Sequence, residues 1–294
     1  MQEKGSDSVS TKDVSETLLG KDTVYPQRYD ASVLTPLPRQ RGVTTDVWGE
    51  DIWNAFELSW LRQDGVPEVA IGAFRVPAST PCLIESKSFK LYLNSLNQMP
   101  IDSIVTLHDL MARDLSAAAG GEVEIQLSAP NEEGQIEGCA CVSPIFLAEQ
   151  LFTAVSPELA EEEGNLICLD RLAMSPPPQP LNVKAGPTLS EVVYSNLLKT
   201  NCPVTGQPDW ATVFIAYRGP QIDRSALLTY LVGLRQHQDF HEHCVEQIYA
   251  RILADCQPER LLVYARYTRR GGLDINPWRA SFPVTVPNLR LARQ

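Results

Sequence analysis

Residues 192–217 of this chain, VVYSNLLKTNCPVTGQPDWATVFIAY, decide the fold of its second half. The segments Val192–Leu198 and Trp210–Tyr217 are rich in aliphatic, β-branched and aromatic residues, a composition that favours β-strands. Prolines and a glycine lie between them, and they favour a turn because proline restricts φ while glycine tolerates backbone conformations that other residues avoid. The stretch therefore predicts two strands joined by a turn-rich loop.

The segments that follow this stretch add helices and one more strand. Apolar residues at helical spacing predict helices over residues 223–236 and 240–255. Residues 260–267, RLLVYARY, are predicted to form a strand. The second half thus has the order strand, strand, helix, helix, strand.

The first half of the chain has a similar order of patterns. Its strand-like segments are residues 51–61, 67–76 and 122–127. Its helical segments are residues 86–96 and 101–119. Asp102 stands where the N-cap of the second helix is expected, because its carboxylate can accept hydrogen bonds from free backbone amides.

The repeated order of elements predicts an α+β protein with two tandem modules, each an antiparallel sheet backed by helices. We expect a flexible tail and an extended segment over residues 1–45, an N-terminal module over 46–174 and a C-terminal module over 175–294. Residues 175–180, SPPPQP, suit a linker because proline is excluded from helix interiors and central strands.

Composition limits the class of protein. Of the 294 residues, 44% are hydrophobic, so the chain can bury a large core, but no run of eighteen apolar residues predicts a membrane-spanning helix. The polar first residues and seven scattered cysteines favour the cytoplasm. A formal net charge of -11 disfavours direct binding to nucleic acid, whose affinity for proteins comes mostly from Lys and Arg.

Cys202 differs from most other cysteines of the chain in its surroundings. It precedes Pro203 in the turn-rich loop and stands seven residues before Asp209. Catalysis by cysteine needs a thiolate and a proton donor or acceptor within reach, and such a loop can supply both. The turn residues explain the loop equally well without any chemistry. From spacing alone, Cys202 can be a nucleophile, a metal ligand or a buried thiol.

Two other stretches are candidates for ligand binding. ESKSFK, residues 85–90, begins a helix directly after a strand-like segment. Its first residues can cap that helix, or the helix N-terminus together with Ser86 and Lys87 can hold an anionic ligand. TRRGG, residues 268–272, ends a strand, where glycines allow a phosphate to approach the backbone and arginines can bind it.

Motifs for other kinds of site are absent or weak. Neither the Rossmann nor the P-loop glycine pattern is present. His241 and His243, with Cys244, can in principle bind a metal, but positions two apart on a helix point about 200° apart. The pair Cys139 and Cys141 is no better. We therefore expect no metal.

Taken together, these stretches resemble the NADPH-dependent 7-cyano-7-deazaguanine reductases, the QueF nitrile reductases of queuosine biosynthesis. The resemblance covers the chain from about Leu18 to its end. Its motifs are ESKSFKLYLNS (85–95), NCPVTGQPDW (201–210), His241-Glu242 after Phe240, and RRGGLDINP (269–277). The chain looks like the long, type II form, with the ESKSFK signature in the first module and the cysteine in the second.

The resemblance implies two tunnelling-fold modules, a homodimer, and sites where modules meet. It also implies reduction of the nitrile of 7-cyano-7-deazaguanine to the primary amine, with two NADPH per turnover and neither flavin nor metal. Cys202 would attack the nitrile to form a covalent thioimide, and Asp209 would donate a proton to its nitrogen. His241 would assist proton transfer.

The binding residues implied by the resemblance fall into two sets. The set for the deazaguanine base is Ile84, Glu85, Ser86, His241 and Glu242. Carboxylates suit that base because they accept hydrogen bonds from its amino and ring N–H groups. The set for NADPH is Ser86, Lys87, Arg270 and Gly271, to which we add Lys90 and Arg269 as charge partners for its phosphates.

Two other functions are consistent with the same fold. A cyclohydrolase-like reaction on a pterin or purine would need zinc ligands, for which the cysteines and histidines form no convincing set. A protein that only binds a deazapurine, or only assembles with a partner, would have no need for the Cys202 thiol and the Asp209 acid beside a basic strand. We therefore expect an enzyme.

Overall fold

A single eight-stranded sheet forms the centre of the molecule, in the strand order β5-β3-β2-β11-β10-β9-β8-β7. The computed structural model describes residues 25–39, 47–136, 140–159, 164–175 and 180–294. The tail expected at residues 1–20 and the prolines at 176–178 lie outside these ranges. The strands are β2 (Trp48–Leu61), β3 (Pro67–Pro77), β5 (Glu124–Ser128), β7 (Leu166–Cys168), β8 (Leu189–Asn201), β9 (Pro208–Gly219), β10 (Arg260–Tyr267) and β11 (Leu273–Ala280).

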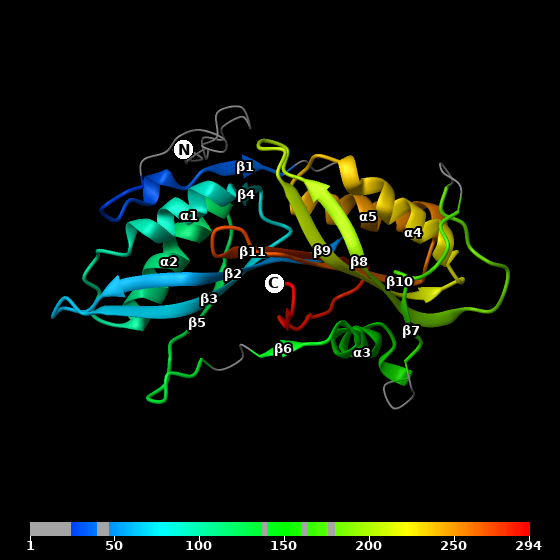
Figure 1. Ribbon diagram of the computed structural model, residues 1–294, viewed down its shortest axis with the longest axis horizontal. Helices are drawn as coiled ribbons and strands as arrows, with labels where there is room; N and C mark the ends of the chain where they lie inside the picture. Colours follow the sequence, from blue (N-terminus) through cyan, green and yellow to red (C-terminus); the bar gives the residue numbers. More distant parts are fainter. Residues whose placement is uncertain (1–24, 40–46, 137–139, 160–163, 176–179) are drawn as a thin grey trace, which may run out of the picture.

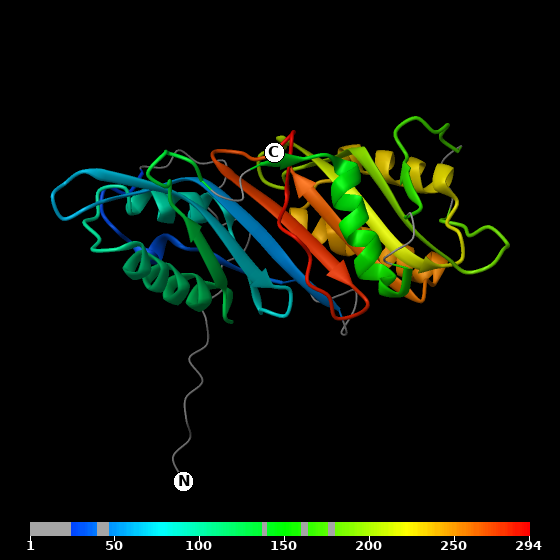
Figure 2. The same cartoon turned by 90° about the horizontal axis from the view of Figure 1, so that it is seen from below.

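Helices cover both faces of this sheet (Figure 1). On one face lie α1 (Ser86–Ser95), α2 (Ile104–Ala119), α4 (Arg224–Gly233) and α5 (His241–Cys256). On the other face, α3 (Pro144–Val155) lies across the strands of the C-terminal half, as Figure 2 shows. Among the described helices, none has both the length and the apolar character needed to span a membrane.

Short elements complete the chain. They are the 3-10 turns η2 (Ala31–Val33), η3 (Pro157–Leu159) and η4 (Leu234–Gln236), and the strands β1 (Pro36–Pro38), β4 (Cys82–Ile84), β6 (Cys141–Val142) and β12 (Arg290–Leu291). β1 pairs with β4, so the segment before β2 lies against the strand that leads into α1. This is the part of the expected extended segment that the structure describes.

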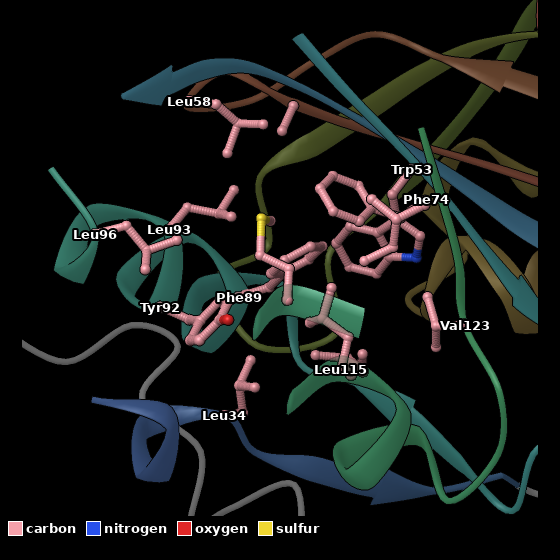
Figure 3. Close-up of a cluster of buried hydrophobic side chains, with 14 of the residues drawn as sticks. Leu34, Trp53, Leu58, Phe74, Phe89, Tyr92, Leu93, Leu96, Leu115 and Val123 are labelled. Atoms are coloured by element: carbon pink, nitrogen blue, oxygen red, sulfur yellow. The ribbon is translucent and has the colours of Figure 1, made fainter. Parts of the chain in front are cut away.

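The N-terminal core forms where α1 and α2 pack on β2 and β3 (Figure 3). Phe89 of α1 is its centre, with the rings of Trp53 and Phe74 edge to face at 5.2 and 5.1 Å. Alternation along β2 explains the arrangement: Trp53 faces this core, while the neighbouring Ile52 belongs to the separate core on the opposite face, to which α3 also contributes. This packing therefore fixes the position of the first turn of α1 relative to the sheet.

The N-terminal caps of the first two helices correct one expectation. Glu85 caps α1 by accepting hydrogen bonds from the amides of Lys87 and Ser88. α2 begins at Ile104, and its N-cap is Ser103, not Asp102. The reason is geometric, because Ser103 has the extended backbone that an N-cap needs and its hydroxyl accepts from the amide three residues on. Asp102 instead accepts a hydrogen bond from Gln63.

The two halves of the chain share one sheet because β2 pairs with β11 over eight residues, from Leu273↔Ala55 to Ala280↔Trp48. The expected α+β class with antiparallel pairing is confirmed, and β7 is the one strand of this described sheet that runs parallel to its neighbour. The sequence patterns did not predict β11, because Pro277 lies inside it. α3 and β7 were not predicted either. Both precede residue 174 in the chain but pack on strands of the C-terminal half. The module boundary at residue 174 stays a prediction.

Candidate active site

Cys202 directly follows β8, in the tight connection to β9. Two backbone hydrogen bonds close this loop, from Cys202 N to Gln207 O at 2.9 Å and from Gly206 N to Cys202 O at 3.0 Å. Gly206 has φ of 67°, a left-handed conformation that glycine adopts without strain. The turn-rich loop of the sequence thus becomes a rigid holder for the thiol, which is buried with 4% of the residue exposed.

The surroundings of the Cys202 sulfur favour the thiolate. Burial by itself raises the pKa of this thiol, but hydrogen bonds from the Thr205 side chain and from the Thr205 and Val204 amides outweigh it. The Arg270 side chain adds a further hydrogen bond, so the pKa of Cys202 lies below its ordinary value. At Cys256, by contrast, burial together with the negative charge of Asp255 raises the pKa of the thiol to about 11, despite the opposing charge of Arg251.

Asp209, the second residue of β9, connects two other groups of the site. Its Oδ2 lies 3.2 Å from Nε2 of His241, and its Oδ1 lies 2.9 Å from Nε of Arg270. Arg270 also donates to the Gln207 side chain at 2.8 Å. The Asp209 side chain is nearly fully buried, so these contacts are poorly screened by water.

His241 and Glu242 are the first two residues of α5. The aromatic ring of Tyr267 stacks on the imidazole of His241. Glu242 is buried, and this burial together with the negative charge of Asp51 raises the pKa of the Glu242 carboxyl. A ligand that brings hydrogen-bond donors to such a buried carboxyl group offsets the free-energy cost of its burial.

These residues line one pocket, which has a volume of about 410 Å³ and is open to solvent. The C-terminal half contributes Cys202, Pro203, Asp209, Asp239, Phe240, His241, Glu242 and Arg270, with Ile275. The N-terminal half contributes Leu37, Trp53, Leu83, Ile84 and Ser86. The pocket therefore lies where the two halves of the chain meet, and it combines apolar walls with a few polar groups.

A second, wider pocket of about 850 Å³ adjoins the first. The two share Ser86, His241, Arg270 and Ile275. The second adds the cationic side chains of Lys87 and Lys90, so the surface beside Cys202 is basic although the chain as a whole is acidic. Such a surface can hold a ligand with phosphate groups.

The glycines of the TRRGG stretch stand in the chain between Arg270 and Leu273, which line this second pocket. Gly271 and Gly272 have φ of 59° and 79°. A side chain at Gly272 would overlap Glu57, which forms an ion pair with Lys90. Close packing of Gly272 against Glu57 thus requires the absence of a side chain, while the approach of a phosphate to this backbone stays a prediction.

Three predicted site residues are placed differently from the rest. Within the described part of the chain, Glu85, Arg269 and Gly271 do not line the two pockets. The two oxygens of Glu85 accept from the amides of Lys87 and Ser88 at 2.7 and 2.8 Å. Arg269 packs over the ring of Phe56 and donates to the backbone oxygen of Gln294 at 2.9 Å. Both residues lie in the connection between β10 and β11, where the Arg270 side chain contacts Asp209 and the Arg269 side chain is held away from the site by Gln294.

Sequence reasoning missed several residues that complete the site. Thr205 hydrogen bonds to Cys202. It lies three residues after Cys202 in the turn-rich loop, and a hydroxyl so close to a cysteine in the sequence could have indicated this contact. Trp53 and Leu83 line the pocket from the N-terminal half, and no local pattern marks them because each also reads as an ordinary core residue. In the ranges that the structure describes, no group of three His, Cys, Asp or Glu side chains could hold a metal ion.

Comparison with known proteins identifies the family. Residues 25–127 match the family model described as nitrile reductase, 7-cyano-7-deazaguanine-reductase N-term, and residues 208–283 match that of QueF-like protein. Among solved structures, the archaeosine synthase QueF-Like in the apo form covers 34% of this chain and 100% of its own. At a TM-score of 0.30 and 13% identity, that likeness carries no argument.

Curated relatives match nearly the whole chain. A protein of Chromobacterium violaceum is 48% identical over 94% of this chain and 96% of its own length. A protein of Bordetella bronchiseptica is 45% identical over 96% of this chain and 99% of its own. Each carries the name NADPH-dependent 7-cyano-7-deazaguanine reductase. With relatives of this identity over nearly the whole chain and family models that match segments of both halves, this chain belongs to the 7-cyano-7-deazaguanine reductase family.

Proposed function

We propose that this chain reduces the nitrile of 7-cyano-7-deazaguanine to the primary amine, 7-aminomethyl-7-deazaguanine, in the biosynthesis of queuosine in tRNA. Two NADPH would be consumed per turnover. The observation that carries the proposal is that Cys202, Asp209 and His241 line one pocket beside a basic surface. The names of the full-length relatives support the same substrate and the same reductant.

The first step is formation of a covalent thioimide on Cys202. The thiolate attacks the nitrile carbon, one bond of the triple bond breaks, and a carbon–sulfur bond forms. The nitrogen takes up a proton, for which Asp209 and its neighbour His241, 3.2 Å apart, are the available acid pair. The lowered pKa of Cys202, which its hydrogen bonds to Thr205, Val204 and Arg270 produce despite burial, increases the thiolate fraction that begins this step.

The later steps break the bond that the first step made. NADPH, when bound, supplies a hydride to the thioimide carbon and a second hydride to the imine that follows. Between these two events the carbon–sulfur bond breaks and Cys202 leaves as the thiolate. Each hydride is matched by one proton delivered through the Asp209–His241 pair, so nitrile, two hydrides and two protons account for the amine.

Recognition of the deazaguanine base is assigned to groups at the inner end of the pocket. Glu242 would accept hydrogen bonds from the amino and ring N–H groups, since it is a buried carboxylate that lines the pocket. Ile84 and Ser86 line the same wall. Glu85 already caps α1, so it would contribute only through its remaining lone pairs.

The residues of the second pocket fit the phosphates of NADPH. Ser86, Lys87, Lys90 and Arg270 line it, and Gly271 lies beside Lys90 at its edge. Lys90 would exchange its contact with Glu57 for a phosphate. Arg269 suits this role least, because its guanidinium is bound to the Gln294 backbone.

We further propose that the chain acts as a cytoplasmic homodimer. Support comes from the edges of the sheet, where β5 and β7 each have one neighbour within the described chain. An edge strand can pair with the same strand of a second copy.

The test combines stoichiometry with mass measurement. Purified protein should oxidise two NADPH per amine formed from 7-cyano-7-deazaguanine. Without NADPH, intact-mass analysis should show one covalently added substrate in the wild type and in Cys256→Ala, but none in Cys202→Ala. Cys256 is the matched control because it is a buried thiol whose pKa burial raises to about 11. A folded wild type that forms neither adduct nor amine would contradict the proposal.

A further inference from the structure

The imidazole of His241 lies flat against the ring of Tyr267. The ring centroids are 3.8 Å apart and the planes differ by 3°. Tyr267 is the last residue of β10 and is fully buried, whereas His241 is the first residue of α5. The contact therefore joins the end of a strand to the beginning of a helix.

Hydrogen bonds alone do not fix the orientation of the His241 ring. Nε2 meets Asp209 at 3.2 Å, but Nδ1 is buried without a hydrogen-bond partner among the residues that the structure describes. A ring held at one atom can still tilt about that contact. The face of Tyr267 removes this freedom, because a flat partner at stacking distance permits only one plane.

The backbone of Tyr267 is itself held on both sides. Its N–H donates to Oδ1 of Asn276 at 3.1 Å, and its carbonyl accepts from Nε2 of Gln294 at 3.0 Å. The same Nε2 donates to Asn276 at 2.7 Å, which joins the two anchors. β10 and β11 are paired from Leu262↔Ala280 to Tyr264↔Trp278, so at Tyr267, beyond this register, the two side chains hold the backbone instead of a ladder with β11.

The hydroxyl of Tyr267 is not the functional part of the residue. It is buried, and the side chains that interact with it, those of Thr200 and Cys244, line neither pocket. Burial raises the pKa of Tyr267 well above its usual value, so the phenol stays neutral while the enzyme works. What Tyr267 offers to the site is the face of its ring.

We propose that Tyr267 is a positioning residue, whose ring sets the plane of the His241 imidazole so that Nε2 stays aligned with Asp209 during proton transfer. The kinetic part of this inference rests on the proposed nitrile reduction. The structural part, the stacking and its loss, can be measured without any substrate.

The structural test is an NMR experiment on the full chain with 13C-labelled histidine. Only four histidines are present, and His241→Gln identifies the signal of interest. Protons above an aromatic face are shifted upfield, so the His241 ring protons should show this shift in the wild type and in Tyr267→Phe. They should lose it in Tyr267→Leu and in Tyr267→Met. Ordinary chemical shifts for His241 in the wild type would overturn the proposal.

The kinetic test compares the same variants. In Tyr267→Leu we expect kcat to fall by between tenfold and about a hundredfold, the loss typical of a misplaced catalytic group, and the solvent deuterium isotope effect to rise. KM for the nitrile should change by less than about twofold, because Tyr267 lines neither pocket. Tyr267→Phe should recover most of the lost kcat, since it keeps the ring and lacks only the hydroxyl.

A control separates positioning from general damage to the core. Tyr249→Leu removes another buried tyrosine, from the middle of α5, and should keep kcat while it lowers the unfolding temperature. Equal losses of kcat in Tyr267→Phe and Tyr267→Leu would overturn the proposal, as would an unchanged kcat in a Tyr267→Leu protein that has lost the upfield shift. If Tyr267→Leu does not fold, Tyr267→Met is judged by the same two criteria. Failure of the wild type to reduce the nitrile would refute the proposed function and leave the NMR result standing.

Discussion

At the residue scale, the state of the Cys202 thiol is decided by its neighbours in the loop. Burial opposes ionisation, and three contributions from Thr205 and Val204 together with Arg270 reverse that effect. The Thr205 hydroxyl is the largest of the factors that lower the pKa. The side chain of Thr205 is therefore the place where the reactivity of the nucleophile can be tuned without touching the nucleophile itself.

We predict that Thr205→Ala raises the pKa of Cys202, whereas Thr205→Ser leaves it nearly as it is. Loss of the hydroxyl favours the neutral thiol, so the pH at which half of Cys202 is thiolate moves upward. At neutral pH, alkylation of Cys202 by iodoacetamide should then slow by up to about tenfold, the factor that corresponds to one pKa unit. Peptide mass spectrometry of Cys202 across the pH range measures this. Equal profiles for the Ala and Ser variants would show that the hydroxyl plays no part.

At the scale of elements, the N-termini of α1 and α2 are each capped by one specific side chain, that of Glu85 and that of Ser103. Ser103 caps α2 through its hydroxyl, and Gly120, with φ of 75°, ends the helix. Asp102 also has a side chain that can cap a helix, but its carboxylate accepts a hydrogen bond from Gln63 instead. Sequence spacing locates such caps to within a residue or two, because neighbouring polar residues compete and only the backbone dihedrals choose between them.

We predict that Ser103→Ala lowers the free energy of unfolding by about 1 kcal/mol, the usual effect of losing an N-cap. Asp102→Ala should change it far less, since its contact with Gln63 is exposed to solvent. Urea denaturation of both variants, followed by circular dichroism, measures the difference. A larger loss in Asp102→Ala than in Ser103→Ala would mean that Asp102 caps the helix in solution.

At the scale of the whole molecule, the seam between β2 and β11 joins the two halves, and a buried ion network lies at one end of it. Arg279 of β11 contacts Asp51 of β2 at 2.9 Å and Glu246 of α5 at 2.6 Å. Arg39, from the segment after β1, contacts the other oxygen of Asp51 at 2.6 Å. The network ties the helix that carries His241 and Glu242 to strands of both halves.

We predict that Arg279→Met destabilises the protein by about 3 kcal/mol, because the buried Asp51 keeps only Arg39 of its two charge partners and the half-buried Glu246 loses its contact with Arg279. Arg62→Met, which removes the exposed pair with Asp64, should leave the stability nearly unchanged. Guanidinium denaturation monitored by tryptophan fluorescence compares the two. Similar midpoints for both variants would show that the network contributes little to joining the halves.

The sequence by itself predicted the class of fold and most strands and helices, and its resemblance to a known family grouped Cys202, Asp209, His241 and Glu242, which line one pocket in the structure. It could do so because periodicity, turn chemistry and short motifs are properties of neighbouring residues. Glu85, Arg269 and the cap of α2 were placed differently by the structure, since each depends on a direction that spacing does not fix.

Only the tertiary structure decided the seam between β2 and β11, the walls that Trp53 and Leu83 contribute, and the stacking of Tyr267 on His241. These contacts join residues that lie far apart in the chain or belong to different strands and helices. Their geometry follows from strand register and packing density, which are settled by the whole core at once and leave no mark in any short stretch of sequence.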